Sequence, residues 1–202
     1  MGKKNIMALL AATLIGMSAQ AAELTTGSAA PEFKLTDTKG VEHSLSDFKD
    51  KLGVLESINH GCPFVVKHYS SGNMQALQKE FTEKDVIWLS ICSSAEGKQG
   101  YMSNEEWNAT VAEKGAAPTA VLVDEDGTVG KAYNARTTPH MYVINPEGNL
   151  IYQGAIDDKK STDVEDIATS ENYVRSALNA AMAGEPVTTP QTQAYGCGVK
   201  YQ

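Results

Sequence analysis

Apolar residues recur along this chain with two different periods. Residues 52–58 and 85–92 are mostly apolar, which predicts two buried strands of a parallel sheet. Between them Met74, Leu77 and Phe81 have the spacing of the buried face of a helix. A strand, a helix and a strand in this order predict a right-handed βαβ unit whose functional residues lie at the carboxyl ends of its strands.

The rest of the chain supplies further elements of the same sheet. The turn signal from Asp37 to Gly40 predicts a short N-terminal β-hairpin. Ser103 and Glu106 have the spacing of a capping box, which predicts a helix that ends near Lys114. The remaining predictions are a strand at 119–123, a short helix at 128–134, a hairpin at 141–153 and a helix at 171–183. Together they predict an α/β fold, with a central mixed sheet flanked by helices.

The first 21 residues have the organisation of a signal peptide. Lys3 and Lys4 precede the apolar segment 6–17, and the small residues Ala19 and Ala21 fit a signal-peptidase site. A retained membrane anchor is the alternative, but it needs about 20 apolar residues, and this segment is shorter. We therefore expect cleavage after residue 21, export to a periplasm and no membrane span in the mature chain.

Charge and composition narrow the function classes. The chain carries 17 basic and 25 acidic side chains, a formal net charge of −8, so nucleic acid is not an expected partner. We expect one domain over residues 22–184 and an irregular C-terminal tail over 185–202, whose Thr, Gln and Pro content is typical of a loose linker. Three cysteines cannot all pair within one chain, so an oxidising compartment leaves at least one thiol free or intermolecular.

Cys62 is the candidate nucleophile. It follows the predicted strand 52–58 and the segment Asn59-His60-Gly61, and Pro63 then suits the first position of a helix. The free N–H groups and positive dipole end of that helix favour a thiolate, which lowers the pKa of a cysteine. A buried structural cysteine is the alternative, but the polar and flexible approach over 59–61 favours a reactive thiol.

The order of strand, sharp turn, Cys62-Pro63 and helix resembles the active-site segment of the thioredoxin superfamily, and more closely its redoxin branch, which includes the thiol-specific antioxidant proteins. The segment 30–48 also resembles the lead-in of redoxin domains, and the resemblance covers nearly all of residues 28–184. It implies a thioredoxin-like fold. Val65 stands where thioredoxins have their second cysteine, and Asn59 and Leu55 stand where peroxiredoxins have threonine and proline.

The resemblance also implies roles for residues around Cys62. Pro139 falls where thioredoxin-like proteins have a cis proline that faces the active-site cysteine. Glu56 falls where thioredoxins have a buried acid that relays protons, although a water-exposed carboxylate at a strand edge is the alternative. Pro139 also stands where peroxiredoxins have a peroxide-binding arginine, and Arg136 is the nearest arginine. The residues expected to face the substrate are His60, Gly61, Pro63, Thr138 and His140.

Cys197 is the candidate for the missing second thiol. Gly196 and Gly198 flank it and permit a close approach of the backbone, and Tyr195, Val199 and Tyr201 are candidates for docking the tail. The tail between Gly184 and Cys197 is long enough to cross the face of the domain. We expect a disulfide between Cys62 and Cys197, with two alternatives: Cys62 pairs with Cys92, or Cys197 pairs between two chains.

These observations predict an exported thiol–disulfide oxidoreductase of redoxin type. Cys62, Cys197, Glu56 and Pro139 are assigned to the chemistry. The expected partners are a protein or small-molecule substrate that carries a disulfide or a peroxide, and an external thiol reductant; no cofactor and no metal is expected. A thiol-dependent peroxidase is the first alternative. The second is a thioredoxin-like protein that is inactive or binds copper through His60, His140 and Cys197.

Overall fold

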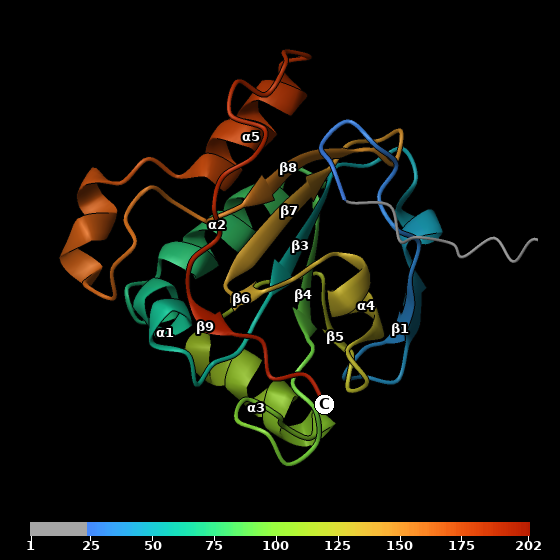
Figure 1. Ribbon diagram of the computed structural model, residues 1–202, viewed down its shortest axis with the longest axis vertical. Coiled ribbons are helices and arrows are strands. Elements are labelled where there is room, and N and C mark those ends of the chain that lie inside the picture. Colours follow the sequence, from blue (N-terminus) through green and yellow to red (C-terminus); the bar gives the residue numbers. More distant parts are fainter. Residues whose placement is uncertain (1–23) are drawn as a thin grey trace, which may run out of the picture.

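The computed structural model describes residues 24–202, which fold around one five-stranded mixed sheet (Figure 1). The strand order is β5-β4-β3-β7-β8. The strands of the sheet are β3 (Gly53–Ser57), β4 (Ile87–Cys92), β5 (Ala120–Val123), β7 (His140–Ile144) and β8 (Leu150–Gly154). The first three are parallel to one another, and β7 and β8 are antiparallel to β3 and β7 respectively. Cys92 is thus the last residue of β4, and Cys62 follows the carboxyl end of β3.

Helices cover both faces of this sheet, and two small strand pairs complete the fold. The helices are η1 (Leu45–Phe48), α1 (Pro63–Ser70), α2 (Asn73–Thr82), α3 (Asn104–Lys114), α4 (Thr128–Ala132), η2 (Val164–Thr169) and α5 (Tyr173–Met182). The small pairs are β1 (Lys34–Thr36) with β2 (Glu42–Ser44), and β6 (Thr137–Thr138) with β9 (Cys197–Gly198). In Figure 1, α1 and α5 lie to one side of the sheet and α4 and β1 to the other.

The side chains of β3 alternate between two separate apolar cores, as the pleat of a strand requires. Val54 packs into the core formed with α1, α2, α3 and α5, whereas Leu55 packs into the core formed with α4 and the N-terminal hairpin. Glu56 projects into the first of these cores, on the side of Val54. The acid of the central strand therefore lies on the same side of the sheet as α1, the helix that begins after Cys62.

The fold confirms the α/β prediction and most of its elements. Helix α1 ends at Ser70, and α2 begins at Asn73 after its N-cap Gly72, whose φ is 75°. Ser103 and Glu106 form the predicted capping box of α3. The predicted signal peptide at 1–21 lies outside the described residues. Within residues 24–202, no helix combines the length and the apolar character that crossing a bilayer requires.

Candidate active site

Cys62 occupies the N-cap of α1, and Pro63 is the first residue of that helix, as predicted. The turn before Cys62 is held by its own hydrogen bonds. The Asn59 side chain accepts from the N–H of Gly61 at 2.8 Å and donates to the backbone and side-chain oxygens of Gln99 at 3.1 and 3.0 Å. Asn59 is buried, so the prediction of a flexible polar approach at this position was wrong.

The sulfur of Cys62 is fully buried and lies between two other segments of the chain. The thiol donates to the backbone oxygen of Thr138 at 3.0 Å, and its sulfur accepts from the N–H of Cys197 at 3.4 Å. Burial acts to raise the pKa of Cys62, but hydrogen bonds from the Cys197 thiol, from the backbone N–H groups of Val65 and Cys197 and from Thr138 outweigh it and lower that pKa. Cys62 is thus a covered thiol that nevertheless ionises more readily than an ordinary cysteine.

The residues that cover Cys62 belong to the C-terminal tail. Strand β9 pairs antiparallel with β6, with Cys197 opposite Thr138. The tail is therefore docked on the domain and is not the loose linker that its composition indicates. Burial and the hydrogen bond to Cys62 raise the pKa of Cys197 to about 11, so Cys62 ionises before its neighbour.

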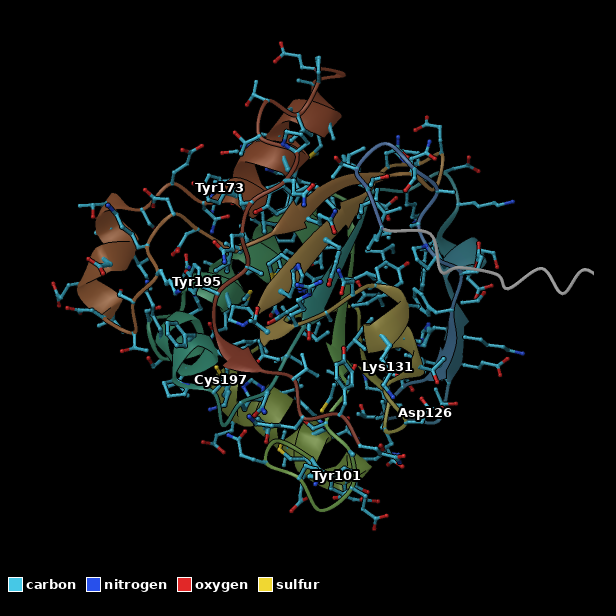
Figure 2. The ribbon with its side chains drawn as sticks, viewed as in Figure 1. Tyr101, Asp126, Lys131, Tyr173, Tyr195 and Cys197 are labelled. Atoms are coloured by element: carbon cyan, nitrogen blue, oxygen red, sulfur yellow. The ribbon has the colours of Figure 1, made fainter. Side chains whose placement is uncertain are left out.

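Specific contacts on both sides of Cys197 attach the tail to the domain. The hydroxyl of Tyr195 donates to Asp157, the N–H of Val199 donates to the backbone oxygen of Arg136 at 3.2 Å, and the hydroxyl of Tyr201 donates to the backbone oxygen of Ala135 at 2.7 Å. The three predicted docking residues are thus all in contact with the domain. Figure 2 shows Tyr195 and Cys197 along the same stretch of tail.

Gly196 permits the close approach between the tail and β6. Its φ is 146°, and a Cβ at this position would lie 2.1 Å from the backbone oxygen of Thr138. A side chain is therefore excluded by both sterics and backbone conformation. At Gly198 the nearest atom to such a Cβ is 4.0 Å away, so of the two flanking glycines only Gly196 is required by the contact.

The segment opposite Cys62 has the predicted backbone, and its histidine is neutral near pH 7. The Thr138–Pro139 peptide bond is cis, which confirms the prediction. His140 is buried, and its Nδ1 lies 3.0 Å from the hydroxyl of Tyr142. Burial, with a smaller contribution from Arg136, lowers the pKa of His140 to about 4. The Nε of Arg136 donates to the side-chain oxygen of Asn134 at 3.2 Å.

Glu56 is fully buried, so the exposed alternative is excluded. Four side chains donate hydrogen bonds to its carboxylate. The donors are Tyr69 at 2.9 Å, Ser90 at 2.9 Å, Trp88 at 3.0 Å and Gln78 at 3.2 Å. Burial raises the pKa of Glu56, and the four hydrogen bonds oppose that rise only in part. A carboxyl group of this kind can hold or release a proton closer to neutral pH than a solvated one.

Comparison with known proteins identifies the family of this chain. The model of the AhpC/TSA family matches residues 26–153. The chain belongs to the AhpC/TSA family. Its membership makes the protein an oxidoreductase of the thioredoxin-like redoxin superfamily. The matched segment contains Cys62, Glu56 and Pro139 but ends before the tail, so in this AhpC/TSA protein Cys197 lies outside the matched part.

Solved structures resemble this AhpC/TSA protein over most of its length. An uncharacterized conserved protein from Geobacillus kaustophilus is 29% identical, with a TM-score of 0.76 and coverage of 90% of this chain and 94% of its own. A hypothetical protein from Sinorhizobium meliloti 1021 is 27% identical, with a TM-score of 0.75 and coverage of 89% and 96%. The thioredoxin domain of a thiol-disulfide oxidoreductase from Bacteroides vulgatus shares the fold at 22% identity, with a TM-score of 0.52 and coverage of 73% and 97%. No curated protein matches the chain.

The other predicted substrate-facing residues, His60, Gly61 and Pro63, lie in the turn before α1 and at the first position of that helix. Gly61 and Pro63 are exposed beside the buried sulfur, whereas His60 packs against the rings of Tyr69 and Trp107 at centroid distances of 4.6 and 5.3 Å. Burial and the charge of Lys114 lower the pKa of His60 to about 4. Its imidazole is therefore neutral near pH 7.

Cys92 has a different environment from Cys62. Its thiol is buried and donates to the backbone oxygen of Gly100 at 3.5 Å. Burial raises the pKa of Cys92, and the nearby acids Asp124 and Glu125 contribute in the same direction. Cys92 is thus a packed thiol that ionises less readily than an ordinary cysteine. Over residues 24–202, no group of three or more histidine, cysteine or acidic side chains is arranged to hold a metal ion.

The sequence interpretation missed three charged or polar groups beneath the tail. Lys67 and His68 are buried on α1, and Asp157 is buried after β8 beside both of them. The available signal was the pair Lys67-His68 inside an otherwise apolar helix, because a charge at a buried helix position requires a partner. The sequence separation of about 90 residues hides that partner from any local pattern.

Proposed function

We propose that this AhpC/TSA protein is an exported thiol–disulfide oxidoreductase whose redox centre is the pair Cys62 and Cys197. The observation that carries the proposal is the contact between them. The N–H of Cys197 donates to the Cys62 sulfur at 3.4 Å, although the two residues are 135 positions apart. Their pKa values move in opposite directions, down for Cys62 and up for Cys197. Cys62 is therefore the nucleophile and Cys197 the resolving thiol.

The proposed reaction consists of two thiol–disulfide exchanges. The Cys62 thiolate attacks one sulfur of a substrate disulfide, forms a mixed disulfide and releases the other substrate sulfur as a thiolate. Cys197 then loses its proton and attacks the Cys62 sulfur, which releases the second substrate thiolate and leaves a Cys62–Cys197 disulfide. The substrate gains two electrons and the protein loses two. An external thiol reductant restores both cysteines by the reverse exchange.

Two further groups have supporting roles in this proposal. Glu56 relays protons beneath the pair, and its burial and raised pKa support that role, since a general base works best with a pKa near the working pH. Pro139 holds the segment whose preceding oxygen, that of Thr138, accepts from the Cys62 thiol. His60, Gly61, Pro63, Thr138 and His140 line the approach that a substrate uses once the tail has moved.

Tail movement is a necessary part of the proposal. The Cys62 sulfur has no exposed surface while β9 is paired with β6, so no substrate sulfur reaches it in this arrangement. The pairing involves only two residues on each strand, which limits the number of hydrogen bonds that must break. A substrate therefore enters by displacing residues 197–198 from β6.

A thiol-dependent peroxidase is the second candidate, and membership of the AhpC/TSA family is the observation that favours it. In that reaction the Cys62 thiolate takes one peroxide oxygen, becomes a sulfenic acid and releases an alcohol. Cys197 then condenses with the sulfenic acid to give the same disulfide and water. Pro139 stands where peroxiredoxins have a peroxide-binding arginine, and the Nε of the nearby Arg136 donates to Asn134, so we prefer the disulfide substrate.

Trapping the intermediate tests both the residues and the substrate class. With a disulfide substrate such as insulin, the wild-type protein should yield a Cys62–Cys197 peptide pair, and Cys197→Ser should accumulate the substrate in a mixed disulfide on Cys62. Cys92→Ser is the matched control and should behave as wild type. The same variants with hydrogen peroxide, followed by a sulfenic acid probe, test the peroxidase candidate. A Cys62–Cys92 pair, or no oxidation of Cys62 by either substrate, contradicts the proposed centre.

Export rests on the first 21 residues, with their two lysines, apolar segment and small residues. Expression of the full chain in a bacterium with a periplasm should give a periplasmic protein whose mass corresponds to a start at residue 22. A protein that keeps its first 21 residues and stays in the cytoplasm would contradict export without affecting the redox centre.

A further inference from the structure

A buried ionic cluster joins α1, the helix that begins after Cys62, to the segment that follows β8. Lys67, His68 and Asp157 are each at most 1% exposed. The Nζ of Lys67 lies 3.8 Å and the Nε2 of His68 lies 3.9 Å from Oδ2 of Asp157. Because a buried charge is costly without a partner, Asp157 and Lys67 fix each other in place. The cluster thus links the segment after β8 to α1.

The same carboxylate also binds the tail. The Tyr195 hydroxyl and the N–H of Lys159, the latter at 3.0 Å, both donate to Oδ1 of Asp157. The Tyr195 ring packs edge-on against Phe64 of α1, with centroids 5.6 Å apart. Tyr195 is 5% exposed, so its hydrogen bond to Asp157 satisfies a largely buried hydroxyl. The tail is thus attached to α1 through one buried carboxylate and one aromatic contact.

The distance from Cys62 to Lys67 along α1 is similar to the distance from Cys197 to Tyr195 along the tail. Lys67 lies five residues after Cys62, which is about 7–8 Å along a helix. Tyr195 lies two residues before Cys197, which is about 7 Å along an extended chain. The tail segment from Tyr195 to Cys197 and the helix segment from Lys67 to Cys62 are therefore two sides of similar length. Asp157 contacts both segments at one end, and Cys62 and Cys197 are in contact at the other.

We propose that Tyr195 and Asp157 are positioning residues that hold Cys197 against Cys62 and set the rate at which their disulfide closes. The inference rests on the proposed function, in which Cys197 resolves Cys62. Neither residue exchanges electrons. The hydrogen bond between them keeps the tail docked while the mixed disulfide is present, so that Cys197 attacks before an external thiol does.

Tyr195→Phe is the decisive variant, because it keeps the ring that packs on Phe64 and removes only the hydroxyl. Closure can be followed with dithionitrobenzoate. The reagent forms a mixed disulfide with Cys62 and releases one thionitrobenzoate, and attack by Cys197 then releases a second. All variants carry Cys92→Ala, so that only the pair reacts. We expect Tyr195→Phe to close about tenfold more slowly, since a hydrogen bond to a charged group commonly contributes at least this factor.

The controls separate positioning from stability. Tyr133→Phe removes another buried hydroxyl, which donates to the backbone oxygen of Pro31 at 2.6 Å away from the pair, and should close at the parent rate. If Tyr195→Phe lowers the melting temperature but closes as fast as the parent, Tyr195 is merely structural and the inference fails. If the parent itself releases no second thionitrobenzoate, the proposed function fails instead.

Discussion

At the scale of single residues, the environments of the thiols separate their roles. Cys62 is fully buried, yet backbone N–H groups at the start of α1 and the neighbouring Cys197 compensate for its desolvation. Cys92 is buried to a similar degree, but desolvation dominates and nearby acids oppose ionisation. The reactivity of a cysteine here thus follows the hydrogen-bond donors around its sulfur and not its exposure.

This difference predicts the order in which the thiols react. Alkylation of the reduced protein by iodoacetamide should show a midpoint for Cys62 below pH 9, since its pKa is lowered from the ordinary value of 9.0. The midpoint for Cys92 should lie above pH 9, because its pKa is raised. Quenching at each pH and quantifying the labelled peptides by mass spectrometry gives both curves. Earlier reaction of Cys92 would place the nucleophile elsewhere.

The raised pKa of Glu56 predicts that the stability of the protein depends on pH. Its pKa is higher in the folded than in the unfolded protein, so the folded state binds the proton more tightly. The stability that this provides is fully present below the unfolded pKa and is lost as pH rises through the folded pKa. Urea unfolding of wild type and Glu56→Gln across pH 4 to 9 should show a decline for the wild type that is smaller in the variant. Parallel curves for the two proteins would indicate that the pKa of Glu56 is the same in the folded and unfolded states.

At the scale of elements, periodic patterns explain what the sequence could predict. The strands β3 and β4 and the helix α2 follow from apolar spacing, and the start of α1 follows from Cys62-Pro63. The docking of β9 could not be predicted in the same way, because it depends on single pairs of residues. Tyr195 reaches Asp157 across 38 positions, and no periodicity links them. The sequence shows Gly196 beside Cys197, but only the structure shows the Thr138 oxygen that requires a glycine there.

The contrast between the two tail glycines tests how β9 is held. Gly196→Ala places a Cβ 2.1 Å from the Thr138 oxygen and forces an unfavourable φ, whereas Gly198→Ala meets no atom closer than 4.0 Å. Strain of about 1–3 kcal/mol should undock the tail roughly 5- to 150-fold more often. Alkylation of Cys62 should accelerate by a similar factor in Gly196→Ala and remain near the wild-type rate in Gly198→Ala. Equal rates in both variants would mean that the tail does not limit access to Cys62.

At the scale of the whole molecule, the tail connects parts of the fold that are far apart in sequence. Thr192 docks on Gly154 at the end of β8, Cys197 pairs with β6, and the backbone oxygen of Lys200 accepts from the N–H of Ala95 after β4. The tail therefore crosses the carboxyl end of the sheet, where Cys62 lies (Figure 1). Oxidation of the pair would turn this non-covalent attachment into a covalent one.

A covalent bond between Cys62 and Cys197 predicts a large effect of redox state on stability. It would enclose most of the domain, because the two residues are 135 positions apart. Closing a loop of this size restricts the unfolded chain and should stabilise the protein by up to about 5 kcal/mol, provided that the native geometry is not strained. Urea unfolding with and without reductant should therefore give a higher midpoint for the oxidised protein. Cys197→Ser should unfold at the reduced midpoint under both conditions, and Cys92→Ser should keep the difference. An oxidised wild-type protein that unfolds at the reduced midpoint would show that the pair does not close within one chain.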